Sequence, residues 1–325
     1  MWIAALSSSE VKRGKAIGVK RLGLDLVVWR GTSGRVWTLR DLCPHRRARL
    51  SLGNVAGDRI ECPYHGFQFD GNGNVVTVPA MGRATPLPAH IKASSIPTHE
   101  EFGIIWLWYG EGEPSSGPRF LDDLAGLSAR AEHGEVWPIP LPRAVENQLD
   151  VFHLPFVHRN TIGRGGRIVA QGPVVKRVDD LSFKVYPHNE VDVGQKLLRA
   201  EEVDVTAQEN YLWFIYPNVW ENHISEGLRI VAFFAPVNDK STKVYIIAYL
   251  RASGVNPIDS LLAKVLMPFN VYVLHQDRRV VSSQLGDVVG DRLIHADLPI
   301  VTYRRMYFAD KELQKLLVPQ KELTA

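Results

Sequence analysis

Short apolar runs separated by glycine turns dominate roughly the first 110 residues. These runs are rich in β-branched and aromatic residues, the composition that favours β-strands. The expected strands lie at 19–22, 24–29, 35–39 and 103–109. Between them, the tract DGNGN at 70–74 follows Phe67-Gln68-Phe69 and predicts a hairpin. The pattern therefore predicts an all-β region at the N-terminus.

The pattern changes after a glycine- and proline-rich stretch at 110–118, the best candidate for a linker. Helix is expected at 144–157, at 258–284 with a kink at Pro268, and at 312–317. Strands are expected at 174–178, 182–186, 211–216, 228–235 and 243–250. Strands flanked by long helices indicate an α+β domain with an antiparallel sheet. We predict two domains, 1–115 and 116–325.

Composition excludes several classes of protein. The chain has 325 residues, 45% of them hydrophobic and 22% charged, with a net charge of +3. These values are ordinary for a globular protein, and no basic run with interleaved aromatics indicates nucleic acid. We find no apolar stretch of about 18 residues and no signal peptide, so we expect no membrane span and a cytoplasmic location. The longest apolar candidate, 261–274, is interrupted by Lys264, Pro268 and Asn270.

The two cysteines lie in two similar short motifs. Cys43 and His45 form C-x-H, and sixteen residues later Cys62 and His65 form C-x-x-H. A common zinc finger places both cysteines before both histidines, whereas here each motif carries one of each. Two loops that each give one sulfur and one nitrogen suit a Rieske [2Fe-2S] centre, in which two histidines replace two cysteines on one iron. A zinc site, or buried residues without a metal, is the alternative.

A second group of possible metal ligands lies in the expected helix at 144–157. Asn147, Asp150, His153 and His158 form the pattern N-x-x-D-x-x-H-x4-H. On a helix Asp150 and His153 share a face, and Pro155 would bend the chain to bring both imidazoles to one metal. Two histidines and one carboxylate with open positions form the facial triad of non-haem iron oxygenases.

The cysteine–histidine motifs resemble those of the ring-hydroxylating Rieske oxygenase family, CPHRGAxLSxG and CPYHGW. This chain has CPHRRARLSLG at 43–53 and CPYHGF at 62–67. Arg47 replaces the usual glycine and Phe67 the usual tryptophan. We expect Arg47 to make the loop more basic and Phe67 to change packing only, with neither contacting a ligand. The resemblance implies an N-terminal Rieske domain and a helix-grip-like catalytic domain.

The resemblance also implies roles for residues of the second group. His153 and His158 are implied as iron ligands, and Asp150 as a bridge from the cluster ligands of one subunit to the iron ligands of the next. Asn147 matches a position beside this site. The third ligand is expected at Asp277, since HQDRRVVSSQ at 275–284 resembles the family's [EQ]-D-x-x-[VI]-x-x-x-Q helix. The rival carboxylates are Asp287, Asp291 and Asp297.

The function implied is that of an oxygenase component. A ferredoxin or flavin reductase passes electrons from NAD(P)H to the cluster, and a mononuclear Fe(II) then activates dioxygen beside a small organic substrate. The resemblance implies a homotrimer. The short chain, and VTYRR at 301–305, resemble the homotrimeric demethylase and pheophorbide oxygenase-like group, which favours monooxygenation. The alternatives are a cis-dihydroxylating dioxygenase, a Rieske electron carrier and a zinc-binding structural protein.

Three further sets of residues each have two possible roles or an expected structural role. Several histidines have no partner at ligand spacing and are expected to be structural: His90, His99, His133, His188 and His223. A basic rim beside the cluster loop could dock an acidic ferredoxin or be ordinary solvated surface: Arg46, Arg47 and Arg49. Aromatic residues along the later strands could line a substrate cavity or fill the core: Trp213, Phe214, Tyr216, Trp220, Phe233 and Phe234.

Overall fold

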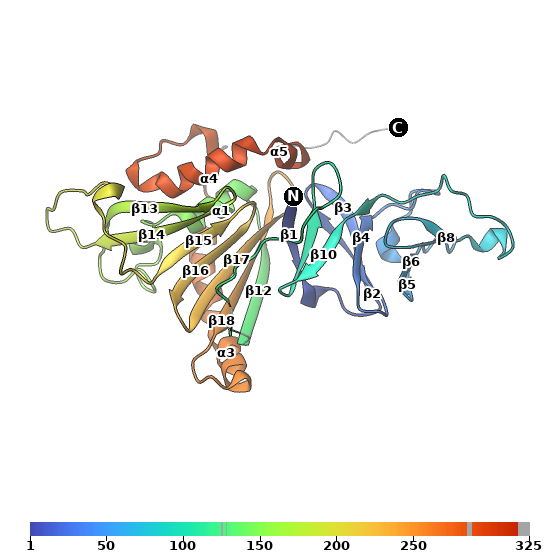
Figure 1. Ribbon diagram of the computed structural model, residues 1–325, viewed down its shortest axis with the longest axis horizontal. Coiled ribbons are helices and arrows are strands. Elements are labelled where there is room, and N and C mark those ends of the chain that lie inside the picture. Colours follow the sequence, from blue (N-terminus) through green and yellow to red (C-terminus); the bar gives the residue numbers. More distant parts are fainter. Residues whose placement is uncertain (125, 128, 285–287, 318–325) are drawn as a thin grey trace. The chain divides into compact units, whose positions relative to one another are not determined.

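The computed structural model describes residues 1–124, 126–127, 129–284 and 288–317. The chain divides into two compact units (Figure 1). Unit 1 contains Met1–Arg119, Ala235–Asp239 and the chain from Glu312, and unit 2 contains Phe120–Phe234 and Lys240–Lys311. The expected division into domains 1–115 and 116–325 stays a prediction.

Unit 1 is built from three small antiparallel sheets. Their strand orders are β1-β11-β10, β2-β3-β4-β9 and β5-β6-β7-β8. The bounds are β1 (Trp2–Ser7), β2 (Lys15–Arg21), β3 (Leu24–Arg30), β4 (Val36–Arg40), β5 (Asn54–Ala56), β6 (Arg59–Glu61), β7 (Gln68–Phe69), β8 (Val75–Thr77), β9 (Ser95–Ile96), β10 (Thr98–Glu101) and β11 (Ile104–Trp108). The all-β prediction for this region is confirmed.

The core of unit 1 packs directly beneath the two cysteine-containing loops. Val27, Trp29, Leu39 and Phe69 are fully buried there, together with both cysteines. The predicted hairpin at 70–74 is present. The Asp70 carboxylate accepts hydrogen bonds from the backbone N–H groups of Asn72 and Asn74, at 2.9 and 2.8 Å, which fixes the turn. This sheet core therefore holds the loops that carry the candidate ligands.

Unit 2 is a seven-stranded sheet with helices packed on it. The strand order is β12-β18-β17-β16-β15-β14-β13, and β12–β18 and the neighbours from β13 to β17 pair antiparallel. Its strands are β12 (Ala129–Trp137), β13 (Val169–Asp179), β14 (Ser182–Glu190), β15 (Tyr211–Ile215), β16 (Val219–Ser225), β17 (Leu228–Pro236) and β18 (Thr242–Leu250). The helices of the chain are α1 (Leu141–Leu149), α2 (Leu154–Val157), α3 (Asn256–Val281), α4 (Leu298–Ala309) and α5 (Lys311–Leu317). The predicted α+β class is confirmed.

The continuous helix expected over 144–157 is wrong. Helix α1 ends at Leu149, and Asp150 has extended backbone angles (φ −69°, ψ 120°). The Asp150 carboxylate accepts hydrogen bonds from the N–H groups of Phe152 and His153, at 2.9 and 3.1 Å. This local turn competes with the helix, as aspartate side chains commonly do. Pro155 does not bend a helix but lies in the first turn of α2, where proline is tolerated.

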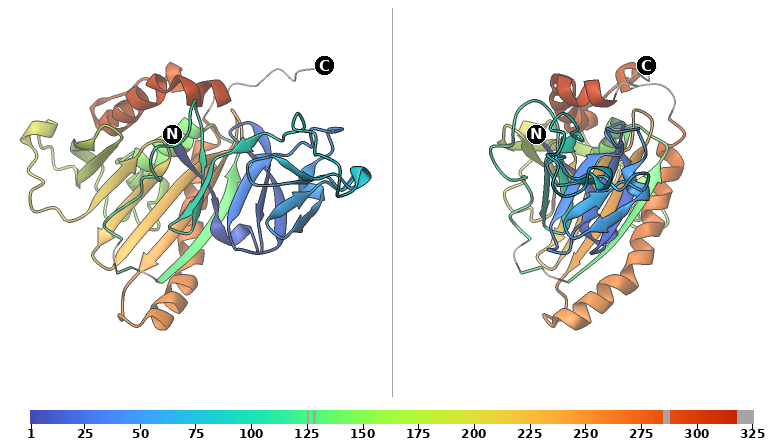
Figure 2. Two further views of the ribbon diagram at one scale, coloured as in Figure 1. Left: turned by 45° about the vertical axis from the view of Figure 1, so that its right-hand side comes forward. Right: turned by 90° about the vertical axis from the view of Figure 1, so that its right-hand side faces the viewer.

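Helix α3 is the long C-terminal helix that the sequence predicts, and it continues through Pro268. An 18-residue window of α3 has a mean hydropathy of 1.3, so by length and composition alone α3 could cross a membrane. The expectation that no such stretch exists is therefore wrong. In the structure α3 packs along β12 and β18 (Figure 2) and brings Asp277 into unit 2.

Strand β16 carries a buried charged cluster, in which His223 is a buried histidine with hydrogen-bond partners, as expected of a structural histidine. His223 Nδ1 lies 3.3 Å from the Asp123 carboxylate, which also accepts a 2.7 Å hydrogen bond from the Tyr211 hydroxyl. On the same strand, Glu221 is fully buried, with its carboxylate 3.2 Å from Arg229 Nε. Burial, and next the negative charge of Asp123, raise the pKa of Glu221 to about 8.

We expect this buried carboxyl group to make stability fall as the pH rises from about 4.5 to about 8. Between these values the folded state keeps the Glu221 proton, whereas the unfolded state releases it. Each increase in pH therefore favours unfolding. Glu221→Gln removes this titration and should raise the free energy of unfolding at pH 8.5 by ~5 kcal/mol relative to the parent, with little difference at pH 4.5. Urea unfolding at both pH values measures this. Parallel pH profiles for parent and variant would contradict it.

Candidate metal centres

The two cysteine-containing loops of unit 1 have the same backbone hydrogen bonds. In the first, Cys43 N–H donates to Ala48 O at 2.8 Å, and Arg47 N–H donates to Cys43 O at 2.9 Å. In the second, Cys62 N–H donates to Phe67 O at 2.8 Å, and Gly66 N–H donates to Cys62 O at 3.1 Å. The loops are therefore structural equivalents, as the two motifs predict.

Both loops need a left-handed residue four positions after the cysteine. Gly66 has φ +69° and Arg47 has φ +60°. Glycine adopts this conformation without steric cost, whereas a residue with a Cβ is disfavoured there by about 1–2 kcal/mol. The glycine expected from the family motif thus has a conformational reason. Replacing it by Arg47 changes more than the charge of the loop.

The four candidate ligands of the loops come together. Cys43 and Cys62 are buried and free, and the rings of His45 and His65 lie 4.8 Å apart, centroid to centroid. Burial raises the pKa of the Cys43 thiol to about 11, and the adjacent Cys62 thiol adds to this, so a bound cation is needed to hold the thiolate. Two thiols and two imidazoles on paired loops fit a Rieske cluster.

Phe67 does more than fill space, and the expectation that it contacts no candidate ligand is wrong. Its ring stacks on the ring of His45 with centroids 4.6 Å apart and an interplanar angle of 18°. Beside the loops, the Arg46 guanidinium lies 5.4 Å from the centroid of the Tyr64 ring. Arg46, Arg47 and Arg49 are all exposed, and their docking role stays a prediction.

Unit 2 brings the second candidate ligand set together from two segments more than 100 residues apart. His153 Nε2 lies 3.3 Å from His158 Nε2 and 3.4 Å from Asp277 Oδ1, and His158 Nε2 lies 2.9 Å from the same oxygen. Asp277 Oδ1 is buried and makes no hydrogen bond within the described residues. Separations of about 3 Å are those of ligands on one metal with bonds of about 2.1 Å. These three residues fit a facial triad.

The electrostatics of this site also suit a cation. Burial opposes a charge on His153, yet Asp150 and Asp277 raise its pKa to about 10. Burial likewise opposes a charge on Asp277, and the two imidazoles nevertheless hold its pKa below the usual range. The surroundings thus stabilise positive charge at the point where the two Nε2 atoms and Oδ1 converge.

Both histidines are oriented by hydrogen bonds on their far nitrogens. His153 Nδ1 lies 3.1 Å from the Asp150 backbone carbonyl, and His158 Nδ1 lies 2.8 Å from Gln276 Oε1. Gln276 Oε1 also accepts a 2.9 Å hydrogen bond from the Thr161 hydroxyl. A metal-binding histidine usually donates its other N–H to such an acceptor. The sequence analysis did not predict that Gln276 and Thr161 help to orient His158. The only signal for this role in the sequence was the position of Gln276 next to the predicted ligand Asp277.

We expect Gln276→Leu to weaken iron binding at this site by roughly 10–100-fold, because the His158 ring loses the acceptor that orients it. Gln276→Glu, which keeps an acceptor at the same place, should lose less. Iron content after dialysis against a graded chelator measures both. Equal iron retention by Gln276→Leu and the parent would show that the hydrogen bond has no such role.

The rival carboxylates do not reach the imidazoles within the described structure. Asp291 pairs with Arg143 at 2.7 Å and with Arg304, and the Asp297 carboxylate accepts a hydrogen bond from the Ile294 N–H. Asp287 lies outside the described residues. The side-chain nitrogen of Asn147 is buried without a hydrogen bond inside the described ranges, and its role stays a prediction.

The triad opens onto a cavity of about 750 Å³. Its apolar wall includes Leu154, Leu212, Trp220, Ile230, Phe269 and Leu274. Asparagine side chains supply much of its polarity: Asn189, Asn210, Asn222 and Asn270. Of the aromatic residues considered for this role, Trp220 lines the cavity, while Phe214, Phe233 and Phe234 are core. The volume and mixed lining suit a small organic molecule.

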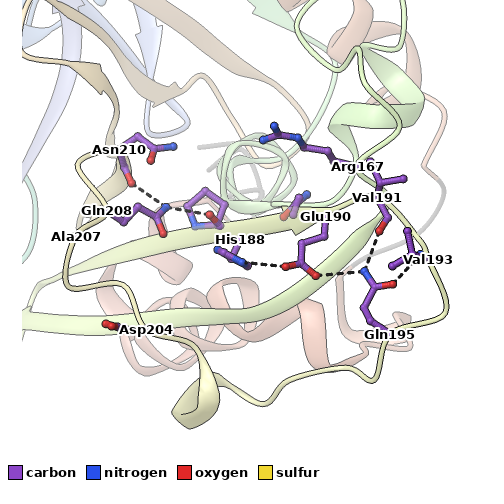
Figure 3. A pocket seen from close by; sticks show the side chains of 12 residues that line it. Arg167, His188, Glu190, Val191, Val193, Gln195, Asp204, Ala207, Gln208 and Asn210 are labelled. Carbon is purple, nitrogen blue, oxygen red and sulfur yellow. Dashed lines mark hydrogen bonds and ion pairs between the residues drawn. The ribbon is translucent and has the colours of Figure 1, made fainter.

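A second hollow of about 790 Å³ adjoins the first (Figure 3). Both are lined by Arg167, Pro187, Asn189, Val191 and Asn210. Here His188, expected to be a structural histidine, lies 3.3 Å from Glu190, whose carboxylate also accepts a hydrogen bond from Gln195.

Comparison with known families identifies both halves of the chain. Residues 1–97 match the Rieske [2Fe-2S] domain, and residues 139–307 match the vanillate O-demethylase oxygenase C-terminal domain. The second match covers more than half of the 325 residues. The chain therefore belongs to the Rieske oxygenases that carry the vanillate O-demethylase type of C-terminal domain. The Rieske domain of this family binds a [2Fe-2S] cluster, and its oxygenase component uses a mononuclear iron.

Individual relatives agree with this family. The chain is 33% identical over 165 residues to a chloroplastic chlorophyllide a oxygenase of Chlamydomonas reinhardtii, a match over 50% of this chain and 25% of that protein. It is 33% identical over 159 residues to a vanillate O-demethylase oxygenase subunit of Pseudomonas sp. (strain ATCC 19151), a match over 47% of this chain and 46% of that one. The matched part thus spans a quarter to a half of these curated relatives.

Solved structures show the same fold. Pseudomonas putida CBB5 NdmA has a TM-score of 0.73 at 22% identity, covering 94% of this chain and 88% of that one. Dicamba monooxygenase bound to 3,6-dichlorosalicylic acid has a TM-score of 0.74 at 20% identity, covering 97% and 96%. At these identities the likeness concerns the fold alone.

Proposed function

We propose that the chain is the terminal oxygenase of a Rieske monooxygenase system, which hydroxylates or oxidatively demethylates a small aromatic or heterocyclic substrate with dioxygen. The observation that carries this proposal is the convergence of His153, His158 and Asp277 at the wall of a cavity with a mixed apolar and polar lining. An electron carrier has no use for such a cavity, whereas an oxygenase must hold a substrate beside its iron.

In this proposal each metal has its own ligand set. Cys43, His45, Cys62 and His65 hold the cluster, and His153, His158 and Asp277 hold the iron. The iron, when bound, supplies the activation of dioxygen. The protein orients the ligands through Gln276 and the Asp150 carbonyl, excludes water with the apolar wall, and positions the substrate.

Electrons are proposed to come from NAD(P)H through a separate flavin reductase or ferredoxin. We propose that they pass from the histidine ligands of one cluster to Asp150 of the neighbouring subunit in a homotrimer. Asp150 suits this role, because its carboxylate oxygen lies 3.6 Å from His153 Nδ1 and its side chain is partly exposed. A cytoplasmic location completes the proposal.

The substrate class follows from the cavity and from what the relatives are named for. Relatives of the matched domains include a vanillate O-demethylase oxygenase subunit, a dicamba O-demethylase oxygenase component and methylxanthine N1-demethylase NdmA. These names describe O- and N-demethylation of aromatic or heterocyclic molecules, and none names a cis-dihydroxylation. We therefore favour monooxygenation over dihydroxylation.

Oxygen uptake with a surrogate reductase tests this function. Methoxylated aromatics and N-methylated heterocycles are screened for substrate-dependent oxygen consumption, and formaldehyde release is measured in parallel. Monooxygenation predicts one formaldehyde for each methyl group removed, with consumption abolished in His153→Ala. The alternative, a Rieske electron carrier, predicts another result. The purified, iron-loaded protein would then reduce a partner's haem or cluster but would consume no oxygen with any compound of the panel.

A further inference from the structure

A second set of two histidines and one carboxylate lies on the edge strand of the unit 2 sheet and on the helix that covers it. His133 and Glu135 are two residues apart on β12, so their side chains leave the same face of the strand. His275 reaches them from α3, which packs along that face. His133 was expected to be structural, and the structure brings it next to Glu135 and His275.

The donor atoms converge on one carboxylate oxygen. Glu135 Oε2 lies 2.9 Å from His275 Nε2 and 3.3 Å from His133 Nε2, and all three atoms lie within 4.8 Å of one another. Tetrahedral zinc with bonds of about 2.0–2.1 Å places its ligands about 3.3 Å apart. The distances from Glu135 Oε2 to the two imidazoles are therefore close to the spacing of ligands around one ion.

The other oxygen of Glu135 is held separately. Trp137 Nε1 donates a 2.7 Å hydrogen bond to Oε1, and Arg278 Nη1 lies 3.5 Å from the same atom. Burial raises the pKa of Glu135, but the hydrogen bonds from His275, Trp137 and His133 outweigh it and lower the pKa below its usual value. The carboxylate is thus ionised, with one oxygen fixed by the indole and the other turned toward both imidazoles.

We propose that His133, Glu135 and His275 form a site for a divalent transition metal, with zinc the best fit. Two imidazoles, one carboxylate and a position open to water are a common zinc ligand set. The side chain of Glu135 is 16% exposed, whereas that of His275 is 50% exposed, so the ion can enter from solvent without opening the fold. A bound ion ties β12 to α3, the helix that carries Asp277.

This site is distinct from the triad and does not depend on the proposed oxygenase function. His275 and Asp277 are two positions apart on one helix and face nearly opposite sides, so an ion at one site does not share ligands with the other. Zinc bound at this site adds to the metal content of the protein without adding iron.

Zinc titration of the iron-loaded full-length protein tests the proposal. Equilibrium dialysis against zinc chloride, with zinc and iron counted by mass spectrometry, is applied to the parent, His133→Ala, His275→Ala and the double variant. We expect one zinc per chain in the parent and an affinity for zinc at least about tenfold weaker in each single variant. Removing only a residue that hydrogen-bonds a metal ligand already weakens metal affinity by about tenfold or more, and these variants remove a ligand itself. The visible spectrum of the cluster reports that each variant is folded.

Two matched controls make the result specific. His99→Ala removes an exposed histidine that lies 3.2 Å from Glu101, a pair with no third ligand among the described residues, and should bind zinc like the parent. His158→Ala disrupts the triad and should also keep the zinc. Zinc binding that survives in the double variant, or that disappears in His158→Ala, would overturn the proposal. Absence of zinc binding in the parent would do so too and would leave a hydrogen-bonded cluster only.

Discussion

His158→Ala is expected to remove the mononuclear iron and reduce substrate turnover to background while leaving the cluster intact. The His158 imidazole is buried, its Nε2 faces Asp277 Oδ1 at 2.9 Å, and alanine leaves two of the three proposed ligands. Iron analysis should show the loss of about one iron per chain, and the visible and electron paramagnetic resonance spectra of the cluster should not change. Oxygen-coupled turnover should fall by at least about 1000-fold, because a metal-dependent reaction loses its metal.

The matched control for this prediction is His90→Ala. His90 is exposed and belongs to neither proposed ligand set, so this variant should keep its iron and its activity. Full turnover in His158→Ala would show that the triad is not the catalytic centre.

Asp150→Asn is expected to keep both metals and yet to lose electron transfer between them. Asparagine retains the oxygen that accepts hydrogen bonds from the Phe152 and His153 N–H groups, so the turn after α1 should survive. The variant lacks the negative charge that contributes to the raised pKa of His153. We expect steady-state turnover to fall by roughly 100-fold. This is the upper end of the loss of activity caused by mutating a residue that hydrogen-bonds a metal ligand.

Single-turnover kinetics separates this defect from a loss of metal. With the cluster reduced in advance, reoxidation on mixing with substrate and dioxygen should be slow in Asp150→Asn and fast in the parent. Asp180→Asn, which removes an exposed carboxylate from unit 2, is the control and should behave like the parent. Normal reoxidation by Asp150→Asn would refute the proposed bridge.

Local patterns predicted strands β2, β3, β4 and β11 and the hairpin of unit 1, but not the strands β1, β5, β6, β9 and β10. The strands from 15 to 40 and the hairpin at 70–74 are encoded by β-branched residues and turn residues that are close in sequence. The two cysteine-containing loops were predictable for the same reason, because each is closed by hydrogen bonds over four or five residues. The φ of +60° at Arg47 was not, since an arginine gives no signal for it.

The predictions for unit 2 failed where charged residues are buried, and where side chains that contact each other are far apart in the sequence. Strands β12 and β16 were missed because ARAEHGEVW and VWENHIS place charges at positions that read as surface, although Glu221 is fully buried. The break at Asp150 was missed because the helix pattern continues across it, while the side chain prefers the local turn.

Long-range side-chain clusters were the least predictable part of the candidate sites. Asp277 was found only through a motif on its helix, and the hydrogen bond between Gln276 and His158 joins residues 118 apart. Glu135 and His275 are 140 residues apart. Spacing within a motif cannot reveal such pairs, because they arise from the packing of α3 against α2 and against β12.

The most direct test of two separate iron centres is a count of iron and acid-labile sulfide in the purified full-length protein. Two metal sites of the proposed kinds predict about three irons and about two sulfides per chain, with His153→Ala retaining about two irons and both sulfides. About two irons and two sulfides in the parent would reduce the protein to a cluster carrier. Iron or zinc without sulfide would contradict the assignment of Cys43, His45, Cys62 and His65.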